Sequence, residues 1–148
     1  MYKRDGCGLQ ITVVWNDEWL TEVRIVAANG LFQGGCQVYA NSDWLLDLAK
    51  KFRGYPKTRE DHFRAVLGEA GLARVTIEAF GVDASGHVAL AVRMIEEPSL
   101  APREDRSQEA EIVFVFEPAA ADRFADELEA MARTVEGSAS LKGVPAFQ

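Results

Sequence analysis

Apolar and polar side chains alternate over much of the first forty residues, which is the pattern of half-buried β-strands. The alternation covers residues 9–15 and resumes over residues 19–28. Asn29-Gly30 then predicts a hairpin into a third strand over residues 31–40, because both residues tolerate the positive φ of a type I′ turn. Tight connections of this kind favour antiparallel pairing of the three strands.

The apolar spacing changes to three and four residues in the next segment, which predicts an amphipathic helix. Its apolar positions are Leu45, Leu48, Ala49 and Phe52. Asn41 or Ser42 can cap the start of this helix, and Gly54 followed by Pro56 ends it.

Residues 58–70 hold Phe63, Val66 and Leu67 at a spacing that permits a second, short helix capped by Thr58. Gly68 disfavours a helix at this position, because glycine loses more backbone freedom than other residues when it becomes helical. Gly71 weakens the helix further, so the pattern permits a short helix without deciding the structure of this segment.

The second half of the chain begins with two alternating segments, residues 74–82 and 87–96, which predict a hairpin across residues 83–86. Residues 97–109 contain two prolines and many charges, so a solvated loop is expected before a strand over residues 111–117. Pro118 lies where a helix tolerates the missing N–H, in its first turn. The apolar stripe of this last helix is Ala121, Phe124, Ala125, Leu128, Met131, Ala132 and Val135.

These elements predict a single α+β domain over residues 1–148. Its antiparallel sheet has about six strands in the order βββα-βββα, with two main helices packed on it. The C-terminal tail, residues 138–148, has the composition of a flexible segment. Docking of Leu141, Val144 or Phe147 on this subunit or another would order it.

Charge changes the picture, because the net charge of -7 is concentrated in one half. Residues 1–70 carry nine basic and nine acidic side chains, whereas residues 71–148 carry seven and fourteen. A surface with this excess repels phosphate backbones and attracts basic proteins. We therefore expect no nucleic acid partner.

The chain shows neither a signal peptide nor an apolar run that could span a membrane, which favours a cytoplasmic protein without a membrane partner. Cys7 and Cys36 are then expected as free thiols, with Cys36 buried and Cys7 in a mobile N-terminus. Neither belongs to a CxxC pair, and no GxGxxG, P-loop or GxSxG motif occurs. We expect no metal and no cofactor.

Candidate catalytic groups are few, because the chain has only two histidines. His87 follows Asp83 by four residues and could pair with it, and Cys36 would complete a nucleophile, base and orienter set if the fold brought the three together. The simpler interpretation is a half-exposed histidine at a hairpin end and a buried cysteine. His62 is expected on the surface.

Tryptophan is frequent at binding surfaces, and Trp19 directly follows Asp17 and Glu18. This mixture of aromatic and acidic groups is typical of surfaces that recognise basic proteins. A position in the core or at its edge is nevertheless the commoner reason for a tryptophan, and it is the favoured interpretation of Trp15, Trp19 and Trp44. Further acidic candidates for a partner surface are Glu96, Glu97, Glu104 and Asp105.

Two other features have a functional and a structural interpretation. Gly34-Gly35 could allow close approach of a ligand, although a β-bulge or strand bend is the commoner reason for such a pair. A basic cluster could hold an anion or could be the solvated end of a helix. It consists of Lys50, Lys51, Arg53, Lys57, Arg59 and Arg64.

Several turns and helix ends form a shared pattern along the chain: Asn16–Leu20, Phe32-Gln33-Gly34, Leu45 and Leu48 with Gly54-Tyr55-Pro56, Val82–His87 and Pro118–Leu128. Together they resemble a group of small bacterial proteins, some of which look like the immunity proteins of polymorphic toxins. The resemblance implies an α+β fold and a protein partner, and it brings no functional residues with it.

The leading hypothesis is therefore a soluble binding module, immunity-like in character, that engages a basic protein through an acidic surface and one or two tryptophans. The alternative is a small hydrolase or transferase that uses His87 and Asp83, or a domain that binds a small molecule. A homodimer formed through sheet edges or the tail is compatible with each.

Overall fold

The computed structural model describes residues 6–68, 73–96 and 108–144. Its elements in chain order are β1 (Cys7–Asn16), β2 (Thr21–Asn29), β3 (Gln33–Ala40), α1 (Ser42–Phe52), β4 (Phe63–Gly68), β5 (Ala73–Val82), β6 (Val88–Glu96), β7 (Gln108–Phe116), α2 (Pro118–Thr134) and β8 (Ser138–Val144). The fold is α+β with one antiparallel sheet and two helices, as the hydrophobic pattern predicts.

The sheet has eight strands in the order β3-β2-β1-β8-β7-β6-β5-β4, so the prediction of about six strands is wrong. The two additional strands are β4 and β8. β8 lies between β1 and β7 and joins the two halves of the sheet, through five register pairs with β1 and two with β7. The predicted order βββα-βββα is therefore matched only in part.

β4 replaces the short helix that residues 58–70 were expected to form. Ala65 and Leu67 are buried and Phe63 packs against the core, whereas Arg64 and Val66 are exposed, so the segment alternates with a period of two. The helix prediction placed Val66 on the same side as Phe63 and Leu67. Its exposed position in β4 shows why that spacing was misleading.

β8 forms within the segment expected to be a flexible tail. Ala139, Leu141 and Gly143 are buried, and Ser140 and Lys142 between them are exposed. Leu141 docks within this chain, against the core, whereas Phe147 lies outside the described residues. Gly143 is required here, because a Cβ at this position would lie 2.8 Å from Phe114 and 2.9 Å from Cys7 Sγ.

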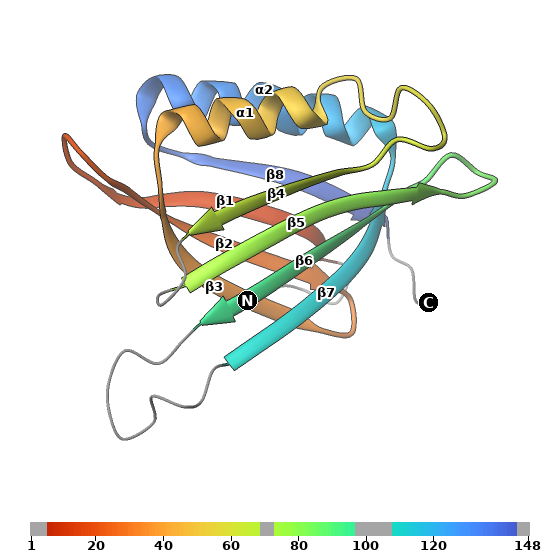
Figure 1. Cartoon of the computed structure of the whole chain (residues 1–148), viewed down its shortest axis with the longest axis horizontal. Helices are drawn as coiled ribbons and strands as arrows, with labels where there is room; N and C mark the ends of the chain where they lie inside the picture. The colour runs from red at the N-terminus through yellow and green to blue at the C-terminus, as the bar shows by residue number, and fades with distance from the viewer. Residues whose placement is uncertain (1–5, 69–72, 97–107, 145–148) are drawn as a thin grey trace.

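The sheet is strongly curved, and α1 and α2 lie side by side over its concave face (Figure 1). The curvature brings β3, at one end of the strand order, into contact with β4, β5, β6 and β7. An added Cβ at Gly34 would lie 2.9 Å from Met94 Cε, the flexible end of a side chain that could shift. The register of β2 with β3 runs without a shift past Gly34 and Gly35, so the glycine pair does not mark a bulge in this pairing.

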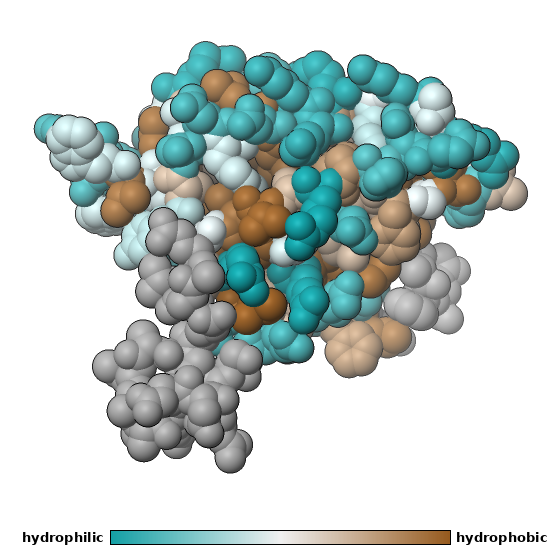
Figure 2. Space-filling model, in the orientation of Figure 1, coloured by the Kyte–Doolittle hydropathy of each residue, from teal (hydrophilic) through white to brown (hydrophobic). Residues whose placement is uncertain are grey.

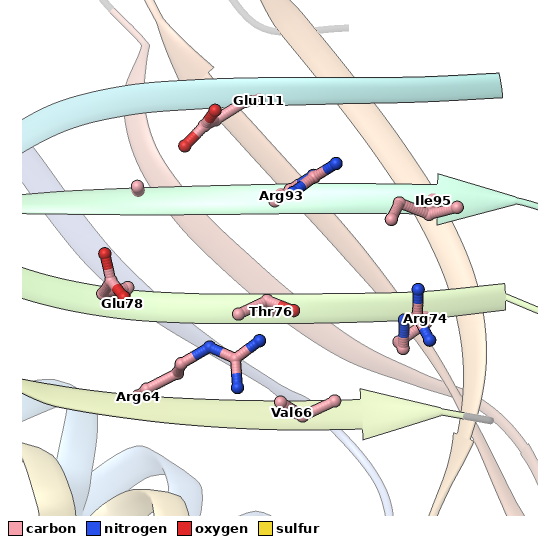
Figure 3. Close-up of a pocket in the computed structure, with 9 residues that line it drawn as sticks. Arg64, Val66, Arg74, Thr76, Glu78, Arg93, Ile95 and Glu111 are labelled. Atoms are coloured by element: carbon pink, nitrogen blue, oxygen red, sulfur yellow. The ribbon is translucent and has the colours of Figure 1, made fainter. Parts of the chain in front are cut away.

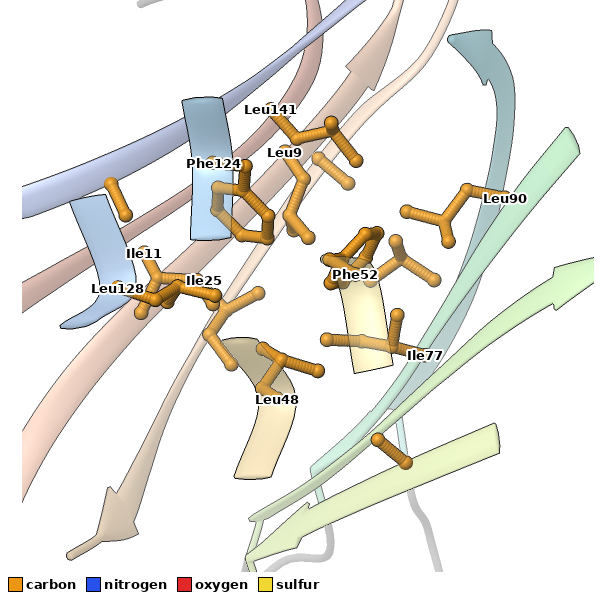
Figure 4. Packing of buried hydrophobic residues seen from close by; sticks show 14 of the residues in the cluster. Leu9, Ile11, Ile25, Leu48, Phe52, Ile77, Leu90, Phe124, Leu128 and Leu141 are labelled. Atoms are coloured by element: carbon orange, nitrogen blue, oxygen red, sulfur yellow. The ribbon is translucent and has the colours of Figure 1, made fainter. Parts of the chain in front are cut away.

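Phe52, in the last turn of α1, lies at the centre of the core (Figure 4). Its ring packs edge-on against Phe63 and Phe124, with centroid distances of 4.9 and 5.0 Å. The contacts link α1 to β4 and to α2. Asn41 caps α1 by accepting the backbone N–H of Trp44 at 2.8 Å, and Pro118 stands in the first turn of α2, as predicted.

Within the described ranges, neither helix is long and apolar enough to cross a membrane.

Candidate functional site

The hairpin between β1 and β2 projects from the rest of the molecule (Figure 1). Asp17 holds its turn: Oδ1 accepts the backbone N–H groups of Trp19 and Leu20 at 2.7 and 2.8 Å. These two donors lower the pKa of the Asp17 carboxyl group, because they favour its charged form. Asp17, predicted as a partner-binding residue, therefore has a structural role in shaping the turn.

A β-bulge places Trp15 on the outer face of this hairpin. The register of β1 with β2 shifts between Val13 and Trp15, which leaves Val14 as the extra residue. Without the shift, Trp15 would share the buried side of Ile11. With it, Trp15 stands opposite Glu22, and half of the Trp15 residue surface is exposed (50%).

The resulting outer face combines large aromatic side chains with carboxylates. Glu22 stands opposite Trp15 on one side and opposite Tyr39 of β3 on the other, so these three side chains form one cross-strand row. Trp19, at the tip, is 82% exposed. We call Val14, Trp15, Glu18, Trp19, Leu20, Glu22 and Tyr39 the hairpin surface.

The negative charge of the hairpin surface has no basic neighbour within ion-pair distance. Among the described residues, no lysine or arginine forms an ion pair with Glu18 or Glu22. Glu22 accepts a hydrogen bond from Gln37 Nε2 at 3.3 Å, which leaves its charge in place. The hairpin surface therefore combines apolar and acidic side chains. Two of the residues that the sequence predicted to bind a partner, Glu18 and Trp19, belong to it.

The other acidic candidates are not brought to the hairpin. Glu96 ends β6 and lines a small cavity of about 130 Å³ together with Gly35 and Cys36 of β3. The other end of β3, at Ala40, pairs with the start of β2, next to the hairpin turn. Gly35 and Ala40 are five strand residues apart, which places the cavity roughly 17 Å along β3 from the hairpin end. Glu97, Glu104 and Asp105 lie outside the described residues.

His87 and Asp83 do meet, at the turn between β5 and β6. His87 Nδ1 lies 3.4 Å from Asp83 Oδ2, and Nε2 lies 3.7 Å from Glu117 Oε1. Asp83 Oδ1 also accepts the backbone N–H groups of His87 and Ser85, and the His87 bond is the first cause that lowers the Asp83 pKa. This carboxylate holds a turn, as Asp17 does.

Cys36 does not join this pair. It lies beside Glu96, at the far end of β6 from His87, a separation of roughly 30 Å along the strand. Burial, followed by the charge of Glu96, raises the pKa of the Cys36 thiol, which disfavours the nucleophilic thiolate. Cys7 is buried as well, against the expectation of a mobile thiol, and burial raises its pKa too.

A shallow depression of about 410 Å³ lies on the outer face of β4 to β7 (Figure 3). Arg64, Arg74 and Arg93 contribute positive charge to it, and Glu78 and Glu111 contribute negative charge. Figure 2 shows polar and apolar side chains intermixed over this face. The sequence did not reveal this alignment of arginines, because it depends on Arg64 belonging to a strand. The alternation of residues 63–68 was the available indication.

Trp44 lies apart from the other two tryptophans, in the first turn of α1. Its Nε1 donates to the Val66 carbonyl of β4 at 3.2 Å, and the side chain is partly buried. Its position at the edge of the core agrees with the structural interpretation of this residue. In the described part of the chain, no group of three or more histidine, cysteine or carboxylate side chains is placed to hold a metal ion.

Searches with this chain found no matching family model, no similar curated protein and no similar solved structure.

Proposed function

We propose that the protein is a non-enzymatic binding module, immunity-like in character, that engages a basic protein partner through the hairpin surface. The observation that carries the proposal is the exposure of Trp19, 82%, beside that of Trp15, 50%. Indole rings supply large contact areas with few rotatable bonds, and they are enriched among the residues that dominate binding energy.

The charge of the hairpin surface supports a basic partner. Glu18 and Glu22 flank the indoles, and Asp17 keeps its charge in the turn because its pKa is lowered. Lysine or arginine side chains of a partner could pair with Glu18 and Glu22 and stack on the indole rings. The β1–β2 hairpin would present these groups on a scaffold fixed by the sheet.

The experiment compares two exposed apolar pairs at different hairpins. Proteins that copurify with the chain are identified, and the affinity of a purified partner is then measured by calorimetry for W15A/W19A and for the control L31A/F32A. Leu31 and Phe32 are 64% and 67% exposed, at the turn between β2 and β3. We expect W15A/W19A to weaken binding at least tenfold, or about 1.4 kcal/mol, and the control to leave it unchanged. Equal affinity of both variants for the partner would refute the proposal.

The contact of His87 with Asp83 favours a second candidate, a small hydrolase or transferase with His87 as general base. His87 lines neither of the two cavities described above. H87A separates the two candidates, since it should leave partner binding intact and would abolish any activity that depends on this base.

A further inference from the structure

β4 is the last strand of the sheet on its side and pairs only with β5. Such an edge strand has backbone N–H and C=O groups that no neighbouring strand satisfies. β3 contacts β4 without pairing with it. The edge is therefore available to a further strand wherever the surroundings leave room.

Room exists between β4 and α1, where a groove of about 410 Å³ opens. Trp44 forms a wall of this groove and is tied to β4 by its hydrogen bond to the Val66 carbonyl. Leu48 and Ala65 also line the groove, but both are buried, so they contribute little exposed apolar surface. The groove thus offers an aromatic wall beside backbone polar groups, which is the usual setting for the addition of a peptide strand.

The charge of the groove is mainly positive, which favours an acidic ligand. Lys50, Lys51 and Arg64 line it, against the one carboxylate Asp47. Within the described residues, none of the three basic side chains takes part in an ion pair, whereas Arg53 nearby pairs with Asp126 and Glu129. This positive surface persists on a chain whose net charge is -7. Arg64 also lines the adjacent depression, which adds Arg74.

We propose that an extended acidic segment of another protein binds in this groove as an additional strand beside β4. Its backbone would pair with the edge N–H and C=O groups of β4 around Arg64, beside the Val66 carbonyl, which Trp44 Nε1 already occupies. Acidic side chains of the segment would meet Lys50, Lys51 and Arg64, and an apolar side chain would lie against Trp44. The groove is a second binding surface, opposite in charge to the hairpin surface and independent of it.

The test uses a fluorescent eight-residue peptide of alternating glutamate and valine, with fluorescence anisotropy as the readout. A peptide with lysine in place of glutamate is the charge control. Two further peptides carry N-methyl groups on alternate backbone nitrogens, in the two possible registers. Strand addition requires N–H groups along one edge only, so one N-methylated peptide should lose binding and the other should retain it.

The protein variant is K50Q/K51Q/R64Q, and the matched control is R24Q/R133Q/K142Q. Each variant removes three positive charges from exposed side chains that lie on strands or in the last turn of a helix. The control residues line neither the groove nor the depression. We expect the first variant to bind the glutamate peptide at least tenfold more weakly than the control. W15A/W19A should bind it normally, which distinguishes failure here from failure of the proposed function.

Three results would overturn the inference. Equal binding by both triple variants would show that the groove is not the site. Retention of both N-methylated peptides would show attraction of charge without strand addition. If the chain self-associates, does not bind the peptide, and loses its self-association in K50Q/K51Q/R64Q, the β4 edge binds a second copy of the chain and not an acidic segment of another protein.

Discussion

Single residues in this protein show that an acidic side chain beside an aromatic one is not necessarily part of a binding surface. Asp17 and Asp83 both precede exposed turns, and both accept two backbone N–H groups within four residues. Their carboxylates therefore fix local conformation. Glu18 and Glu22 make no such bonds to the turn, so they are the carboxylates of the hairpin that remain for a partner.

The lowered pKa of Asp17 predicts a pH-dependent contribution to stability. A depressed folded-state pKa favours the fold above the unfolded value, about 3.9 for aspartate, and this contribution disappears as the pH falls through the lower folded value. D17N retains an acceptor oxygen for the turn but has no charge to titrate. The stability difference between the native chain and D17N, measured by urea unfolding, should therefore be larger at pH 7 than at pH 3. A difference independent of pH would contradict the role of the charge.

At the scale of elements, the sequence predicts those segments whose periodicity is long and strong. Most residues of α1 and α2, the Asn41 cap of α1, and the hairpins of β1 with β2 and β5 with β6 follow from the sequence pattern, whereas Val135, expected in the helical stripe, is the C-cap of α2. β4 and β8 are short and carry alanine, glycine or serine at several positions, so their alternation is weak. The partners of β8 are β1, some 130 residues away in the chain, and β7, across α2. Local pattern contains no information about such pairing.

The candidate site was predictable only in part, for the same kind of reason. The composition of the turn indicates Glu18 and Trp19, but the exposure of Trp15 depends on the bulge at Val14, which simple alternation does not reveal. Tyr39 joins the surface through the register of β2 with β3. Arg64, Arg74 and Arg93 come together through the pairing of β4 with β5 and of β5 with β6, and so depend on residues 63–68 forming a strand.

β4 itself can be tested with two neighbouring residues that a strand places on opposite faces. Leu67 is 4% exposed and Val66 is 41% exposed. L67A should cost about 2–5 kcal/mol of unfolding free energy, because it leaves a cavity in the core. V66A should change it by about 0.5 kcal/mol or less, as is usual for surface substitutions. Chemical denaturation of both variants measures this, and similar losses would favour the helix that the spacing first indicated.

At the scale of the whole molecule, the fold separates two charged surfaces. The hairpin surface is acidic and lies at the tip of β1 and β2, whereas the basic groove lies between α1 and β4. In the described part of the chain, the acidic side chains of residues 71–148 belong to neither surface, and two of them, Glu78 and Glu111, line the separate depression on the outer face of the sheet. The distribution of charge along the sequence therefore does not locate either surface, because each depends on the local arrangement of side chains in the fold.

The carboxylates of the hairpin should act mainly on the rate at which a basic partner associates. Exposed charges steer encounters over about 8 Å at physiological ionic strength, and added salt screens them. E18Q/E22Q should therefore slow association several-fold at low salt, with little effect on dissociation, and the difference should shrink as salt is added. E96Q/E109Q removes equal charge at the other end of the sheet and is the control. Stopped-flow measurement with the purified partner compares the two. If the control slows association as much as E18Q/E22Q, steering comes from the net charge of the molecule, and the partner contacts at the hairpin are the indoles alone.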